Sequence, residues 1–233
     1  MKYKVIIYER RYILVQFFKL FLFRNSGTFY CAVFAITVHE FSHGYAAYKL
    51  GDPTAKYSGR LSLNPLAHLD PIGALCMLLF RFGWAKPVPI NPMYFRNRKR
   101  DTAITALAGP VANILLALIA VILLAPLIVF VLPHHSNFIT EFIYRLLIEC
   151  IGVNMSFAAF NLIPFPPLDG SKVLGIFLSS ENYNTLFQYE RLGFPILILL
   201  SFTGLLSNAI NFITTPISAL LQFVLNLLIR LHR

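Results

Sequence analysis

The hydrophobic positions of this chain gather in long runs that charged residues seldom interrupt. A bilayer core about 30 Å thick is crossed by a helix of about 20 apolar residues. The runs that reach this length are 28–50, 102–132, 138–163 and 192–213. Two shorter apolar runs, 12–23 and 217–229, lie near the two ends of the chain. The pattern therefore predicts about six membrane-spanning helices, and it predicts a kink near Gly109-Pro110 in the run 102–132.

Between the runs 28–50 and 102–132, proline and glycine interrupt the apolar pattern. The apolar run 71–82 contains Arg81 and is too short to cross a bilayer, which predicts a re-entrant or interfacial segment. In the segment 85–92, three prolines exclude a helix and favour an extended strand or hairpin. We therefore expect an all-α polytopic membrane protein with a re-entrant segment and a short Pro-rich β-hairpin-like loop.

Composition supports the membrane assignment. Hydrophobic residues make up 57% of the chain and charged residues 13%, whereas soluble domains carry about 25% charged residues. This composition excludes an ordinary soluble enzyme and a disordered tail. The cysteines are three in number and show no C-x-x-C spacing, so we interpret them as small buried hydrophobic side chains.

The net charge of +10 does not indicate nucleic-acid binding, because the basic residues lie at the ends of the apolar runs. That placement is typical of membrane topology and of contact with anionic lipid headgroups. With the basic N-terminus in the cytoplasm, the outer connections fall near 25–27, 133–137 and 214–216, and none of them contains Lys or Arg. The positive-inside rule therefore predicts that both termini are cytoplasmic.

The second apolar run contains a cluster of ionisable residues, His39-Glu40-Phe41-Ser42-His43, which is an H-E-x-x-H pattern. Residues four apart lie on one face of a helix, so both imidazoles can bind one metal ion. Glu40 stands beside the first histidine, where its carboxylate can take a proton from a metal-bound water. Because ionisable groups in the hydrocarbon region cost roughly 2.5–3.5 kcal/mol each, a shared metal accounts for this cluster better than helix packing does.

Two histidines leave a tetrahedral zinc site short of a protein ligand. The carboxylates near the apolar runs are Glu149 and Asp169. Glu149 lies four residues after Arg145, so a local ion pair is its simpler role. Asp169 follows a proline-rich break after the run 138–163, and its alternative role is to cap a short helix from Ser171. The residues alone leave both carboxylates open as the third ligand.

Four segments between about residues 28 and 175 carry a family resemblance. They are the H-E-x-x-H motif, N-x-x-P-x-P-P-L-D-G at 161–170, L-N-P-L-A-H-L-D-P-I-G at 63–73 and F-G-W-A-K-P-V-P at 82–89. The sequence resembles the site-2 protease family of intramembrane zinc metalloproteases, in a compact bacterial form without a PDZ domain. Residues 1–233 are accordingly expected to form a single integral membrane protease domain in the cytoplasmic (inner) membrane.

The resemblance implies one zinc ion per chain, with His39, His43 and Asp169 as its ligands. It also implies that Glu40 is the general base and that Asn161 holds the substrate or the developing oxyanion. The expected activity is hydrolysis of peptide bonds in or near transmembrane segments of membrane proteins or peptides, either in regulated proteolysis or in clearing signal-peptide remnants. The rival interpretation is a zinc-binding transporter or sensor without hydrolysis, although such proteins usually show repeats and need no base.

Three further groups of residues have interpretations of their own. The edge of an extended segment can pair with an unwound substrate, so we expect Pro87, Val88, Pro89 and Ile90 to bind substrate. His68 lies in the loop outside the spans, and a structural hydrogen bond is the simpler role for it than metal binding. Asn113 is expected to line the helix bundle or to cap the kink.

Overall fold

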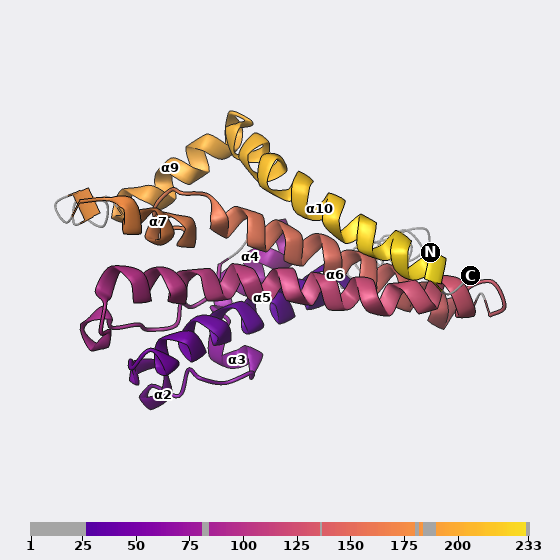
Figure 1. The fold of residues 1–233 in the computed structure, drawn as a ribbon, viewed down its shortest axis with the longest axis horizontal. Coiled ribbons are helices and arrows are strands. Elements are labelled where there is room, and N and C mark those ends of the chain that lie inside the picture. The colour runs from indigo at the N-terminus through magenta and orange to yellow at the C-terminus, as the bar shows by residue number, and fades with distance from the viewer. Residues whose placement is uncertain (1–26, 81–83, 136, 180–181, 184–189, 232–233) are drawn as a thin grey trace, which may run out of the picture.

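The computed structural model describes residues 27–80, 84–135, 137–179, 182–183 and 190–231. These residues are mostly helical, as predicted, and the only strand-like pairing among them is one antiparallel bridge between Leu69 and Ala85. Helices α5 and α6 run along each other through the length of the molecule, and α10 packs against both toward one end (Figure 1).

The first described helix covers residues 27–49 and carries the H-E-x-x-H motif. It ends where Gly51 adopts a φ of 106°, in the left-handed region that glycine reaches without strain. Three short helices follow: α2 (Thr54–Tyr57), α3 (Pro65–His68) and α4 (Pro71–Phe80). His68 is fully buried, and its Nε2 lies 2.7 Å from the carbonyl oxygen of Ser62, as expected for a structural hydrogen bond.

Helix α5 (Arg98–Pro126) continues without a break through Pro110 and passes into a π-helical turn, η2 (Leu127–Val131). Helix α6 (Phe138–Leu162) begins at a capping box formed by Asn137 and Thr140, which satisfies the first free N–H groups. Small buried side chains on α5 let the neighbouring helices approach it closely. Those small side chains are Ala103, Ala106, Gly109, Ala117 and Ala120.

After α6 the chain turns into α7 (Asp169–Leu174) and η3 (Gly175–Phe177), and then forms α9 (Glu190–Phe202) and α10 (Leu205–Leu231). The predicted span 192–213 and the connection at 214–216 are therefore wrong. The break falls just before α10, where Gly204 has a φ of 77°. Helix α10 continues through Pro216, since proline is tolerated within membrane helices.

Three described helical stretches are long and apolar enough to cross a membrane: Arg98–Val131, Phe138–Leu162 and Leu205–Leu231. The expected six spans are not confirmed, and the run 12–23 lies outside the described residues. The run 217–229 is not a separate span but the second half of α10. Helix α4 has 10 residues, hence a length of about 15 Å, and its re-entrant placement stays a prediction.

The predicted β-hairpin-like loop is not a hairpin. Apart from the single bridge at Ala85, and the hydrogen bond of 2.9 Å from the N–H of Lys86 to the carbonyl oxygen of His68 beside it, the described residues 86–91 form no strand pairing, and the 3-10 helix η1 (Pro92–Tyr94) follows. The prolines of this segment have no N–H to donate to a ladder. Two of the remaining N–H groups are bonded to side chains, Val88 to Glu40 and Asn91 to Asp52. The segment therefore has few donors left with which to form a second strand.

Candidate metal centre

The two histidines of the motif lie one turn apart on the helix over residues 27–49, and both are buried. Their rings stand perpendicular to each other, and the two Nε2 atoms are 2.9 Å apart. Each Nδ1 faces away from this meeting point, His39 toward Oδ1 of Asn113 and His43 toward the carbonyl oxygen of Thr105, both at 2.7 Å. The helix spacing and these two bonds direct both Nε2 atoms to one position.

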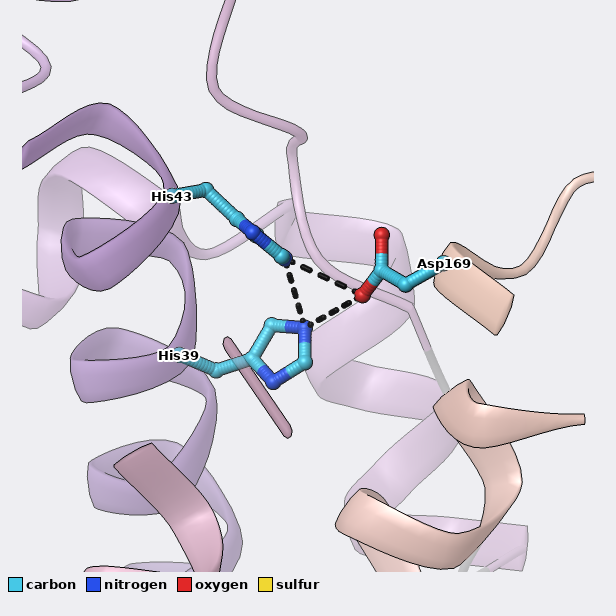
Figure 2. A group of neighbouring side chains, drawn as sticks. All are labelled: His39, His43 and Asp169. Carbon is cyan, nitrogen blue, oxygen red and sulfur yellow. Dashed lines mark hydrogen bonds and ion pairs between the residues drawn. The ribbon is translucent and has the colours of Figure 1, made fainter. Parts of the chain in front are cut away.

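Asp169 reaches the same position from the opposite side (Figure 2). Its Oδ2 lies 3.2 Å from Nε2 of His39 and 3.1 Å from Nε2 of His43. Asp169 is the first residue of α7, and its side chain makes no capping bond, so the capping interpretation is wrong. The proline-rich break after α6 turns the chain back and brings this carboxylate against the helix over residues 27–49.

Glu149, the other candidate ligand, is not part of this group. Its Oε2 accepts a hydrogen bond of 2.8 Å from the hydroxyl of Thr28. The predicted ion pair with Arg145 is also wrong, because Arg145 pairs instead with Glu141, at 2.8 Å. Glu141 lies four residues before Arg145 and Glu149 four residues after it, so helical spacing allowed either carboxylate to pair with Arg145.

The three converging atoms suit a cation. A carbonyl oxygen only accepts, so His43 donates its Nδ1–H to Thr105, and in the neutral imidazole its Nε2 carries a lone pair. Oδ2 of Asp169 is buried and has no hydrogen-bond donor. Lone pairs held this close repel one another unless a positive ion lies between them. Two ligands of one tetrahedral zinc ion lie about 3.4 Å apart, close to the separations found here.

A cavity of about 390 Å³ opens beside these three residues. Glu40 and Asn161 both line it. Oε2 of Glu40 accepts the N–H of Val88 at 2.8 Å, and Nδ2 of Asn161 donates to the carbonyl oxygen of Phe157 at 3.0 Å. Pro87, Val88 and Ile90 contribute to the wall, whereas Pro89 is exposed and is not among the lining residues. The structure thus brings one edge of the Pro-rich segment to the carboxylate of Glu40.

Sequence reasoning missed the part that α5 plays in this centre. Gly109 was expected to mark a kink, yet it lies against the two histidines. A Cβ at Gly109 would stand 2.5 Å from Nε2 of His43 and 2.6 Å from Cε1 of His39. Asn113, expected to line the bundle or cap the kink, hydrogen-bonds to His39 one turn further on. The spacing Gly109-x-x-x-Asn113 on one helix face was the available signal.

Gly109→Ala is expected to reduce zinc affinity at least tenfold, because the added methyl group must displace one or both imidazoles. Gly152→Ala is the matched control, since Gly152 lies inside α6 with nothing within 4 Å of its Cβ position. This control should bind zinc normally and gain roughly 0.5–1 kcal/mol of stability from the higher helix propensity of alanine. Zinc competition with a chelator measures the first effect and thermal unfolding the second. Equal zinc affinity in both variants would contradict the steric role of Gly109.

Comparison with known proteins identifies a peptidase family and candidate zinc metalloproteases, in agreement with the metal centre described above. The model of peptidase family M50 matches residues 28–203. YwhC of Bacillus subtilis strain 168, whose name marks it as a candidate zinc metalloprotease, is 37% identical over 173 residues, covering 74% of this chain and 78% of YwhC. Rip2 of Mycolicibacterium smegmatis, named in the same way, is 30% identical over 179 residues, covering 75% of this chain and 66% of Rip2. No solved structure matches the chain.

Proposed function

The chain belongs to peptidase family M50 and is an intramembrane zinc protease, and we propose that it hydrolyses peptide bonds in or near transmembrane segments of its substrates. In this proposal His39, His43 and Asp169 hold the zinc ion, and Glu40 is the general base. The observation that carries it is the convergence of two Nε2 atoms and one carboxylate oxygen beside a cavity that Glu40 also lines. A metal-binding group and a base thus share one site.

Zinc, when bound, supplies the Lewis acid that polarises a peptide carbonyl and lowers the pKa of water toward about 7. The carboxylate of Glu40 accepts the proton of the attacking water and passes it to the leaving amine. The N–H of Val88 holds this carboxylate on the cavity wall. Asn161, on the same wall, has an amide that can donate to the substrate or to the oxyanion that develops on it.

The substrate contacts in this proposal involve Pro87, Val88 and Ile90 rather than a full β-ladder. The N–H of Val88 is engaged by Glu40, and Pro87 and Pro89 have none to offer. An unwound substrate is therefore bound by apolar contact with the cavity wall and by carbonyl groups of this segment. Pro89, which faces away, takes no part in this contact.

Ile90→Ala is expected to lower kcat/KM for a membrane substrate by about tenfold or more, because it removes apolar contact at the cavity. Zinc content should stay unchanged, since Ile90 is not one of the three residues proposed to hold the zinc ion. Leu66→Ala is the control, an equivalent apolar truncation at a strongly exposed position on α3. Parallel cleavage assays and metal analysis on both variants check this prediction. Equal kcat/KM in the two variants would remove Ile90 from the substrate site.

The rival function, a zinc-binding transporter or sensor without hydrolysis, is not favoured. Such a protein could use the same three ligands, but it has no need for a carboxylate held on the same cavity wall. The family is a peptidase family, and the names of YwhC and Rip2 mark both relatives as candidate zinc metalloproteases. The site therefore fits hydrolysis better than transport.

The cellular setting forms the finer part of the proposal. We place the chain in the cytoplasmic (inner) membrane as a single protease domain with both termini in the cytoplasm. Basic residues at the ends of the apolar runs, and the absence of Lys and Arg from the predicted outer connection 133–137, support this orientation. The substrates in this proposal are transmembrane proteins or peptides, including signal-peptide remnants. Attaching a reporter to each terminus tests the orientation.

The direct test of the proposed function is cleavage by the purified full-length protein in lipid nanodiscs. A transmembrane peptide of known sequence should be cut, cleavage should stop with a zinc chelator, and added zinc should restore it. Cleavage that continues after complete metal removal would contradict a zinc mechanism. Bound zinc without cleavage of a broad panel of transmembrane peptides would favour the transporter or sensor.

A further inference from the structure

Asn113 is a fully buried side chain that connects three helices at the candidate metal centre. It lies on α5, and its Oδ1 faces Nδ1 of His39 at 2.7 Å. Its Nδ2 donates to the carbonyl oxygen of Ala35, at 3.2 Å, and to Oδ1 of Asn154 on α6, at 2.8 Å. All the polar atoms of this carboxamide are therefore engaged, and each bond goes to a different residue.

These bonds determine which way the carboxamide of Asn113 points. The oxygen of Ala35 can only accept, so the atom of Asn113 that faces it must be the NH2 group. The orientation of Asn154 is fixed in the same way, because its Nδ2 donates to the carbonyl oxygen of Cys150 at 2.9 Å. Its Oδ1 is thus left to face Asn113. With both donors of Asn113 assigned, its remaining atom is an acceptor, and it faces His39.

We propose that Asn113 is a positioning residue that holds His39 in the tautomer with the proton on Nδ1. An acceptor at 2.7 Å requires a donor, so Nδ1 of His39 carries the hydrogen and Nε2 keeps its lone pair for the metal. Asn154, on α6, orients Asn113 and thereby supports His39 indirectly. This inference rests on the proposed metal centre and adds to it a residue that no motif of the chain assigned.

The two histidines differ in how their orientation is secured. His43 bonds to the main-chain carbonyl of Thr105, which no side-chain substitution removes. The orientation of His39 depends on the side chain of Asn113 and on the carboxamide of Asn154, which bonds to Asn113. Substitution at position 113 therefore changes the support of one ligand and leaves that of the other in place, which makes the role of Asn113 testable.

The first test compares Asn113→Leu with Asn113→Asp in the purified full-length protein. Leucine has nearly the shape of asparagine but accepts no hydrogen bond, so the zinc dissociation constant should rise about 10–100-fold. Aspartate keeps an acceptor toward His39 but has no N–H for the carbonyl oxygen of Ala35 or for Oδ1 of Asn154, so its zinc affinity should lie between those of Asn113→Leu and the wild type. Thr37→Val is the control: it removes a hydrogen bond from a buried hydroxyl to the carbonyl oxygen of Val33, on the same helix as His39, and neither residue is a proposed ligand. Its zinc affinity should not change.

The second test needs no variant. Nitrogen-15 NMR of histidine-labelled, zinc-loaded wild-type protein should show the proton of His39 on Nδ1 and the metal on Nε2. The opposite assignment would overturn the proposal, and so would wild-type zinc affinity in a folded Asn113→Leu protein. Equal losses of affinity in the leucine and aspartate variants would also overturn it, because the acceptor that aspartate keeps toward His39 would then make no difference. If the wild type itself binds no zinc, the proposed metal centre fails rather than the role of Asn113.

Discussion

Asp169→Ala is expected to remove zinc and to abolish cleavage at the same time. Its Oδ2 lies within 3.2 Å of both Nε2 atoms and is the only carboxylate oxygen in the described cluster of possible ligands. Loss of a residue that only supports a ligand typically costs 10–100-fold in affinity or activity, so loss of a ligand itself should cost more than about 100-fold in zinc affinity. Zinc content by mass spectrometry and turnover on the same preparation measure both effects.

Glu149→Ala is the control for this experiment, because Glu149 is the other carboxylate that the sequence offered as a ligand. Its bond to Thr28 lies outside the cluster, so zinc content should stay at the wild-type level. Full zinc occupancy in Asp169→Ala, together with zinc loss in Glu149→Ala, would reverse the assignment. Loss of zinc in neither variant would mean that both carboxylates are dispensable for metal binding.

The sequence could predict the part of the site that depends on local geometry. A spacing of four residues on a helix places His39 and His43 on one face whatever surrounds them, and the structure has them there. Asp169 was harder, because over a hundred residues separate it from His43 and no local rule links them. The residues alone left Glu149 and Asp169 open, and the family resemblance favoured the one that the structure brings to the histidines.

The contacts that the sequence could not predict are mostly made by the main chain. The carbonyl of Thr105 and the N–H of Val88 act on His43 and Glu40, and every residue has such groups, so no residue type marks them. Asn113 has a distinctive side chain, but its partner is on another helix. Its role depends on how α5 lies against the helix over residues 27–49, which a single sequence does not reveal.

The errors in the fold have a related cause. Apolar composition continues across residues 192–229, so hydropathy alone could not place the helix break within it. The predicted connection at 214–216 contains Pro216, yet the chain breaks at Gly204, which has a φ of 77°. For the Pro-rich segment, composition correctly excluded a helix but did not reveal the lack of a partner strand, because the N–H groups of Val88 and Asn91 bond to the side chains of Glu40 and Asp52.

Glu40→Gln separates metal binding from chemistry. Glutamine has the size of glutamate, and its Oε1 can still accept the N–H of Val88, so the cavity wall should keep its shape. The three ligands are untouched, and zinc content should equal that of the wild type. Glutamine cannot accept the proton of the attacking water, however, and general acid–base assistance is worth 10²–10⁴-fold.

Because the same carboxylate also serves the leaving amine, cleavage by Glu40→Gln should fall by at least roughly a thousandfold. Glu40→Asp is the matched variant: it keeps a carboxylate but shortens the side chain by one methylene, so we expect activity between those of Glu40→Gln and the wild type. Zinc content and single-turnover cleavage, measured on one preparation of each protein, test the two roles separately. Turnover by Glu40→Gln near the wild-type rate would contradict a general-base role. Loss of zinc in this variant would instead identify Glu40 as a ligand.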